Sequence, residues 1–390
     1  MDQAEGPRWL GFAAACLAIA AVGENSTAIM AALPAMARAF GLDASGTEWL
    51  VNAYLLASAS FIVLGGEGAG RMGAGPASAV GATLFGLASA AVALLPDGGA
   101  VIAARAVQGL GAAFAVAGTL ALVTIGADEG VRALRIGTWT GSLMLGFSIG
   151  PLLGGALTLA FDWRAVFWLN AALMLVAVAG LAWRHRAPAR PPPAAAIDGR
   201  GFLLLAGFMV AVTFGIRALP QLDVAAWSSL GPLAAAAALL VALVLVERRL
   251  AHPFFVLAFL AHRRFALAMA LGALSMFNIL SLLLYYNLYA QAADGLGMSA
   301  VRAGLSLVPL SVTLFVVARL APRLVARFGL RVTMLAGALL TAAGAAAIDR
   351  VIAQPVMLAL AFVVMGAGLA LPYASAPRMG LMALAGAEAA

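Results

Sequence analysis

Two charged residues stand inside long apolar runs of this 390-residue chain. Glu24 lies in the run 10–33, and Arg105 lies in the run 100–125. Burying a charge in such a segment is costly, so a carboxylate and a guanidinium in these places suggest the handling of ions or protons. A nearby arginine also favours the ionised form of a carboxyl group. We therefore predict a proton-coupling pair, and a static ion pair between two helices is the alternative.

The apolar runs that contain these two residues have the length of transmembrane helices. Hydrophobic residues make up 64% of the chain and charged residues 10%, whereas a water-soluble domain carries about a quarter charged residues. Continuous apolar runs of this length, without alternation, also argue against a β-barrel. The predicted spans are 10–33, 48–67, 76–95, 100–125, 135–160, 164–183, 201–220, 230–247, 264–290, 301–319, 331–348 and 355–374.

The basic residues indicate how these spans are oriented. All 23 are arginine, and most fall in loops on one side if the N-terminus is placed in the cytoplasm. This distribution predicts membrane topology and no nucleic-acid partner. The three histidines, His185, His252 and His262, stand too far apart for a metal motif, and Cys16 is the single cysteine. We therefore expect no metal, no cofactor and no enzymatic activity.

A basic, proline-rich stretch at 184–200 divides the chain after the sixth span. Its composition is typical of a semi-extended cytoplasmic linker. Two other stretches, 66–73 and 322–329, each precede a span, lie on the expected inner face and contain Arg-x-Gly at the end. An internal repeat on either side of a linker is typical of secondary transporters that are built from two helical bundles.

These two stretches resemble a loop motif of the major facilitator superfamily, which lies between the second and third helices of that fold. GEGAGRMG is similar to the motif and PRLVARFG to its weaker second copy. The matching residues are Gly66, Arg71, Gly73, Arg327 and Gly329. In the family this loop acts as a charge-based latch between the bundles, so Glu67 is the candidate to replace an aspartate that this chain lacks. The alternative for Glu67 is a carboxylate that extends to the inner headgroups.

Two more motifs resemble the fourteen-helix drug:proton antiporter branch of that family. RAVQGLGAA at 105–113 is similar to its helix-four motif, and GFSIGPLLGG at 146–155 is similar to its helix-five antiporter motif. The matching residues of the second motif are Gly146, Gly150, Pro151, Gly154 and Gly155. Glycines at every fourth residue form a strip on which another helix can pack closely, and the proline should bend the helix. The resemblance implies that this motif helps to seal the cavity and favours exchange over leak.

The resemblance also sets the expected domain organisation. A twelve-helix member would carry the second loop copy after its eighth helix, but here the copy follows the tenth predicted span. We therefore predict an all-α membrane protein of the two-bundle, major facilitator type, with about 12 transmembrane helices in this chain and both termini in the cytoplasm. The expected parts are an N-terminal six-helix bundle at 1–183, the linker at 184–200, two inserted helices at 201–250 and an incomplete, four-helix C-terminal bundle at 251–390.

The first helix departs from the family pattern at its acidic residue. The resemblance places the acid at Asn25, whereas this span has Glu24 one position earlier. Glu24 lies about 21 Å along the first span, and Arg105 about 8 Å along the fourth from the opposite side, so the two reach similar depths. In the family these helices line one cavity. We predict that Glu24 and Arg105 face one another or share a polar network. Because Asn25 stands at the family's acidic position, either the helix is rotated so that Glu24 takes over that role, or the acid has been lost.

Other polar residues within the spans are candidates for contact with a substrate. They are Asn52, Tyr54, Gln108, Asn278, Tyr285 and Asn287. Arg105 and Gln108 are three residues apart and share one face of a helix.

Three functions are compatible with the sequence. The first is proton-coupled efflux of drug-like, hydrophobic or cationic compounds across the bacterial cytoplasmic membrane by alternating access. The second is transport of a physiological metabolite by the same fold, and the third is a truncated fragment that transports nothing. We favour the first, and we expect a monomer whose partners are a small-molecule substrate, protons and the lipid bilayer.

Overall fold

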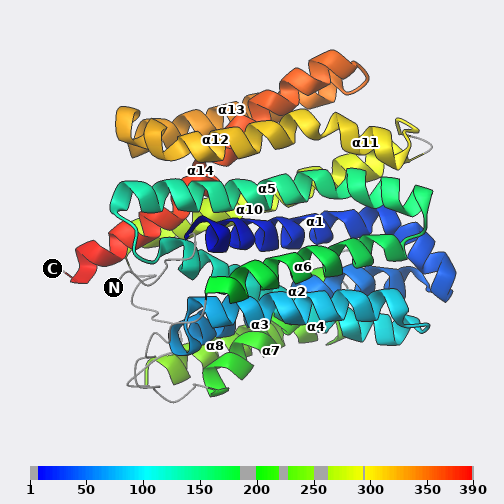
Figure 1. Ribbon diagram of the computed structural model, residues 1–390, viewed down its shortest axis with the longest axis horizontal. Helices are drawn as coiled ribbons and strands as arrows, with labels where there is room; N and C mark the ends of the chain where they lie inside the picture. The colour runs from blue at the N-terminus through cyan, green and yellow to red at the C-terminus, as the bar shows by residue number, and fades with distance from the viewer. Residues whose placement is uncertain (1–7, 185–198, 219–226, 250–261, 293–294, 389–390) are drawn as a thin grey trace.

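The computed structural model of the protein describes residues 8–184, 199–218, 227–249, 262–292 and 295–388. Within these residues the chain is almost entirely helical and contains no strand. Twelve membrane-length apolar helices are present in this described part, which confirms the prediction of an all-α membrane protein with about 12 transmembrane helices. Figure 1 shows them side by side in one layered bundle. The helices are α1 (Arg8–Phe40), α2 (Ala44–Met72), α3 (Ala74–Leu94), α4 (Gly98–Thr124), α5 (Glu129–Ala160), α6 (Arg164–Arg184), α7 (Gly199–Ala218), α8 (Trp227–Glu247), α10 (Arg263–Gln291), α11 (Ala300–Ser306), α12 (Val308–Phe328), α13 (Leu330–Val351) and α14 (Pro355–Glu388).

The helices pack in two groups that meet along α5. In the first group, α1 packs on α5 and α6, and α4 packs on α2 and α3. In the second group, α14 packs on α10, α12 and α13. Helix α5 contacts α11 and α12 as well as α1, and it lies between α1 and α12 in Figure 1. Helices α7 and α8 pack on each other and reach the first group through α2.

The two Arg-x-Gly stretches make the same kind of turn. Gly73 separates α2 from α3 with a φ of 92°, and Gly329 separates α12 from α13 with a φ of 79°. A positive φ is strained for any residue with a Cβ, so glycine suits both positions. The shared backbone conformation gives the sequence repeat a physical basis, because each glycine ends one helix and begins the next.

Several observed helices are longer than the predicted spans, and α1 and α14 continue past residues 33 and 374 to Phe40 and Glu388. The predicted span 301–319 also differs inside its length. Leu307 divides the span 301–319 into α11, which ends at Ser306, and α12, which begins at Val308. Pro309 lies in the first turn of α12. Pro309 has no backbone N–H to donate into a continuous helix. At the other end, Arg319 closes the apolar run, yet the helix continues to Phe328. Arginine is a good helix former, so it ends a hydropathy pattern without ending a helix.

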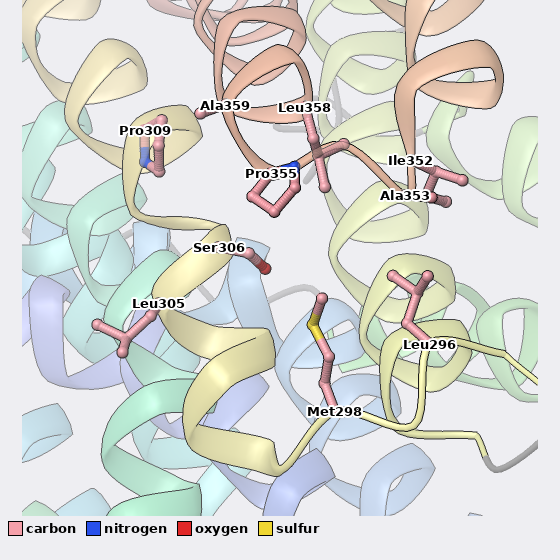
Figure 2. A pocket seen from close by; sticks show the side chains of 10 residues that line it. All are labelled: Leu296, Met298, Leu305, Ser306, Pro309, Ile352, Ala353, Pro355, Leu358 and Ala359. Atoms are coloured by element: carbon pink, nitrogen blue, oxygen red, sulfur yellow. The ribbon is translucent and has the colours of Figure 1, made fainter.

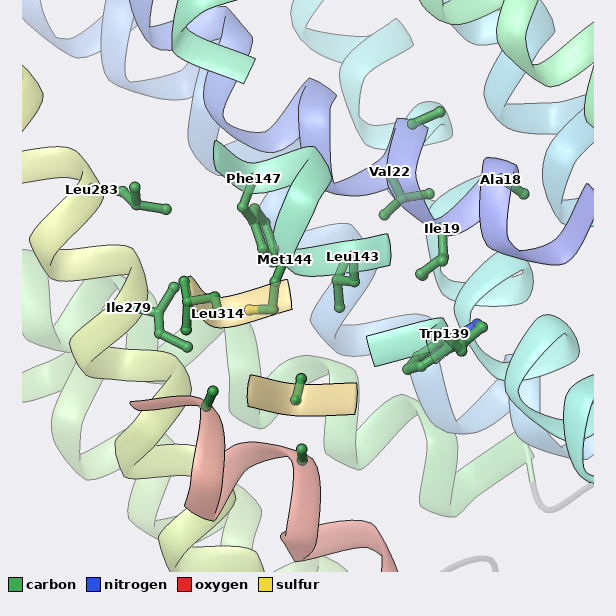
Figure 3. Packing of buried hydrophobic residues seen from close by; sticks show 14 of the residues in the cluster. Ala18, Ile19, Val22, Trp139, Leu143, Met144, Phe147, Ile279, Leu283 and Leu314 are labelled. Carbon is green, nitrogen blue, oxygen red and sulfur yellow. The ribbon is translucent and has the colours of Figure 1, made fainter. Parts of the chain in front are cut away.

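The largest buried cluster crosses the boundary between the two groups. It includes Val22 of α1, Phe147 of α5, Leu283 of α10 and Leu314 of α12, all nearly inaccessible to solvent. Figure 3 shows side chains of these helices in one cluster, with α5 in its middle. This cluster therefore holds the two helix groups together along α5.

Candidate functional site

A buried arginine organises the polar centre of the first group. Arg105 is fully buried on α4. Its Nε donates to the Leu50 carbonyl oxygen at 2.9 Å, and its Nη1 donates to Asn25 Oδ1 at 3.3 Å and Gln108 Oε1 at 2.5 Å. The guanidinium carbon lies 4.4 Å from the centre of the Tyr54 ring. The partners of this charge are therefore neutral acceptors and an aromatic face.

The hydrogen-bond network around Arg105 extends beyond α4 and α1 to α3 and α2. Gln108 Nε2 donates to Asn25 Oδ1 at 3.1 Å and to Ser89 Oγ on α3 at 2.7 Å. Tyr54 on α2 accepts a 3.3 Å hydrogen bond from Ser26 of α1. These bonds link α1, α2, α3 and α4. Their side chains are all buried, where a hydrogen bond is costly to leave unmade.

Glu24 does not join this network. Its side chain is only 3% exposed, and neither carboxylate oxygen has a hydrogen-bond partner. It forms no ion pair with Arg105 in the described part of the chain. Asn25 faces α4 in its place, because neighbouring residues on a helix point about 100° apart. The direct Glu24–Arg105 contact that the sequence suggested is absent from this structure.

Asn170 is a buried polar residue that sequence reasoning missed. It lies fully buried on α6, and its amide approaches Glu24 without the geometry of a hydrogen bond. Its Nδ2 donates to the Val166 carbonyl oxygen at 3.0 Å, and its Oδ1 has no partner. The available signal was an asparagine inside an apolar span.

The glycine strip of α5 contacts the backbone of α1. A Cβ added at Gly146 or Gly154 would collide with the backbone of Ala20 or Ala28, and one at Gly150 would lie 2.7 Å from the Glu24 carbonyl oxygen. Thr27 Oγ1 donates across the same interface to the Phe147 carbonyl oxygen at 2.7 Å. Pro151 and Gly155 are buried within the same continuous helix.

Two earlier glycines of α5 face the opposite way. A Cβ at Gly137 would lie 3.1 Å from the Ala318 carbonyl oxygen, and one at Gly141 would lie 2.8 Å from the Phe315 ring. Nine residues separate Gly137 from Gly146, which is half a turn out of phase on a helix. The small residues of α5 therefore serve two interfaces, one with α1 and one with α12.

The remaining cavity candidates are scattered. Asn52 lines a shallow pocket with Trp49 and Phe214, between α2 and α7. Asn287 is buried on α10 and accepts a hydrogen bond from Gln291. Asn278 and Tyr285 lie on the exposed side of α10. The structure brings together Asn25, Tyr54, Arg105 and Gln108, and it leaves Asn52, Asn278, Tyr285 and Asn287 outside that network.

The charged residues of the loop motif interact locally. Glu67 and Arg71 form a 3.8 Å ion pair one turn apart on α2. Gly66 is exposed on the same helix. Arg327 is exposed, with its guanidinium 5.3 Å from the ring centre of the adjacent Phe328. The Glu67–Arg71 pair therefore stabilises the end of one helix and bridges to no second helix.

A pocket of about 490 Å³ lies away from the arginine network, where α11 ends and α12 and α14 begin. Figure 2 shows the side chains that line it, which are almost all apolar. Ser306 is the polar exception, and its Oγ lies 2.5 Å from the Tyr286 hydroxyl. The pocket resembles an apolar binding surface with one hydroxyl for orientation. Its lining residues are Leu296, Met298, Leu305, Ser306, Pro309, Ile352, Ala353, Pro355, Leu358 and Ala359.

Twelve membrane-length helices in two contacting groups, with Glu24 and Arg105 buried in the first group, define a multi-pass membrane protein. The chain belongs to the Major Facilitator Superfamily, whose family model matches residues 13–384. The family consists of transporters, so this protein is a transporter of the cell membrane and not an enzyme.

Known relatives are resistance and export proteins. The chain is 30% identical to the tetracenomycin C resistance and export protein of Streptomyces glaucescens, over 94% of this chain and 68% of that protein. It is 32% identical to the puromycin resistance protein of Streptomyces alboniger, over 87% of this chain and 67% of that protein. Among solved structures, the xylose transporter XylE from E. coli, in a partially occluded inward-open conformation, matches with a TM-score of 0.62 at 14% identity. That match covers 97% of this chain and 88% of XylE, and it shows the shared fold.

Proposed function

We propose that the protein is a proton-coupled exporter of drug-like compounds that works by alternating access. Support for the cargo comes from the relatives, whose names describe resistance to and export of antibiotics. Support for proton coupling comes from Glu24, a carboxyl group buried within a membrane span. The two contacting helix groups supply the parts that would move. The N-terminal bundle would be residues 1–183 and the C-terminal bundle residues 251–390, with α7 and α8 beside them.

Glu24 is the observation on which the proposed coupling rests. Both of its oxygens are buried without a hydrogen-bond donor. An ionised carboxylate is very costly in such a place unless a proton or another cation neutralises it. Binding of a proton from one side and its release to the other would change the charge of α1 at the centre of the bundle. Movement of the bundles that exposes Glu24 to water would release that proton.

The glycine strip and the loop motif have supporting roles in this proposal. Close packing of α1 on Gly146, Gly150 and Gly154 leaves little space for water or ions beside Glu24. Proton passage would then require movement of the bundles, which favours exchange over leak. Arg71 and Arg327 lie at corresponding turns of the two bundles, where they would contact phospholipid headgroups or each other's bundle in one of the two states.

Replacement of Glu24 by glutamine tests the proposed coupling. In proteoliposomes with a pH-sensitive dye inside, addition of tetracenomycin C, the compound named for one relative, to wild-type protein should drive proton movement, and Glu24→Gln should abolish it. Glutamine keeps the size of the side chain but cannot bind and release a proton. We expect a loss of about 100-fold or more in proton-driven transport, the scale typical of removing a proton-transfer group.

The matched control is Asp349→Asn, which neutralises an exposed carboxylate near the end of α13. This variant should retain drug-driven proton movement. Both variants should show the same elution profile on size exclusion, so a difference between them reports function. Unchanged coupling in Glu24→Gln would rule out Glu24 as the proton carrier.

A further inference from the structure

The charge of Arg105 has no counter-anion. All of its hydrogen bonds go to neutral oxygens, and it forms no ion pair with any residue that the structure describes. A fully buried guanidinium without an anion carries a large desolvation cost. Neutral dipoles and the Tyr54 ring offset only part of that cost. A negative charge placed beside Arg105 would therefore stabilise the buried guanidinium.

Two unused hydrogen-bond donors lie beside this charge. Arg105 Nη2 and Asn25 Nδ2 are both buried and have no partner. The two side chains are in direct contact, because Arg105 Nη1 donates to Asn25 Oδ1. Buried donors are nearly always satisfied in folded proteins. A pair of unsatisfied donors next to an uncompensated positive charge is the chemistry of an anion site.

Two aromatic rings lie close to the guanidinium, and its free Nη2 is the donor left for a ligand. Tyr54 and Phe167 lie over it, with ring centres 4.4 Å and 5.9 Å from the central carbon of Arg105. Nε and Nη1 lie in the plane of the group and are already used. An anion would therefore approach in that plane at Nη2, the direction in which arginine binds carboxylates.

Glu24 cannot supply this anion while α1 keeps its present packing. Bringing Glu24 to the position of Asn25 would require α1 to rotate by about 100°. That rotation would carry larger side chains, such as Ile19, onto the glycine strip of α5. The strip already lies against the α1 backbone and has no room for them.

We propose that Arg105 and Asn25 form a binding site for an anionic group, either a carboxylate of the transported compound or a free chloride ion. The proposal deepens the export function proposed above and rests on it for the identity of the cargo. It assigns to that cargo an acidic group and makes a purely cationic compound the wrong substrate. Arg105 Nη2 and Asn25 Nδ2 donate to the anion, and the charge of Arg105 holds it.

Binding can be measured with benzoate and benzamide, which share a ring and differ in charge. The full-length protein in detergent is heated with either compound, with sodium isethionate to hold the ionic strength constant. Benzoate should raise the apparent Tm by about 3 °C, and benzamide should not. A parallel titration with sodium chloride separates the two sources. A rise with chloride that suppresses the benzoate effect identifies chloride as the resident anion, whereas a rise with benzoate alone assigns the anion to the cargo.

Asn25→Asp and Asn25→Leu form the matched pair of variants. Aspartate at this position places a fixed carboxylate next to Arg105 and should occupy the site. Asn25→Asp should therefore have a higher apparent Tm than wild type and lose the response to benzoate. Asn25→Leu removes that donor and also the Oδ1 acceptor of Arg105 and Gln108, without adding charge, so it should weaken the benzoate response and have a lower apparent Tm. Equal effects of benzoate and benzamide, or an Asn25→Asp protein no more stable than Asn25→Leu, would overturn the proposal.

Glu24→Gln separates this inference from the proposed function. The variant should keep the benzoate response of the wild type while it loses drug-driven proton movement. If wild-type protein moves protons but responds equally to benzoate and benzamide, the anion site is wrong and the proposed export function stands. If wild-type protein moves no protons but responds to benzoate and not to benzamide, and Asn25→Asp abolishes that response, the anion site stands and proton-coupled export is wrong.

Discussion

Gly146→Ala is expected to destabilise the protein strongly, although alanine is the better helix former. The added Cβ would collide with the Ala20 carbonyl oxygen and lie 2.9 Å from the Glu24 backbone nitrogen. Both obstacles are backbone atoms, so no side-chain rotation relieves the clash. Overpacking of this kind costs about 1–3 kcal/mol or more, against a gain in helix propensity of about 1 kcal/mol. We expect less folded protein in the membrane and a fall in apparent Tm of several degrees.

The same helix contains its own control for this substitution. Gly130 lies in the first turns of α5, exposed, and a Cβ added there meets no atom within 4 Å. Gly130→Ala should therefore leave the apparent Tm unchanged or raise it, because only the propensity gain remains. Size-exclusion profiles of both variants after heating measure the difference. If Gly146→Ala proves as stable as Gly130→Ala, close packing of α1 on α5 is not what holds these helices together.

The predicted helices and turns follow from local properties of the sequence. Long apolar runs have few stable alternatives to a helix in a membrane, and glycine is favoured where φ is positive, as at Gly73 and Gly329. Helix ends were less predictable. Hydropathy ended the tenth span at Arg319, yet the α12 backbone continues to Phe328. Hydropathy reports where a helix leaves the bilayer, and hydrogen bonding decides where it stops.

The orientation of α1 could not be read from the sequence. Spacing alone shows that Glu24 and Asn25 diverge by about 100°, but it does not show which of them faces α4. The α1–α5 interface decides this, because the helix must present its close-packing side to Gly146, Gly150 and Gly154. Asn25 then meets Arg105. Matching depths predicted that α1 and α4 meet at this level, which they do. The residue that contacts Arg105 is Asn25 and not the adjacent Glu24.

A disulfide between α5 and α11 is expected to stop transport completely and reversibly. A Cβ at Gly304 would lie 2.8 Å from the Leu152 Cβ and 2.7 Å from its Cα. The two helices must therefore move apart by about 1 Å to reach the separation of about 3.8 Å that a disulfide needs, and the reduced double-cysteine protein is the reference for transport. Cys16 is the only cysteine in the chain, so Cys16→Ser provides a background without thiols. In alternating access by two bundles, the α5–α11 contact has to open in one of the states. Oxidation of Leu152→Cys/Gly304→Cys should therefore abolish export, and a reducing agent should restore it.

A second disulfide within one bundle shows whether the loss reports movement between bundles. Gly86 of α3 and Met174 of α6 lie in the N-terminal group, and a Cβ at Gly86 would be 3.1 Å from the Met174 Cβ. Cross-linking Gly86→Cys to Met174→Cys should leave export intact, because both helices would move together. The glycines of α5 make this contrast informative. Gly146 and its neighbours hold α5 to α1, whereas Gly137 and Gly141 face α12 across the boundary. Export that survives the α5–α11 disulfide would mean that the two groups need not separate there, and alternating access would require a different hinge.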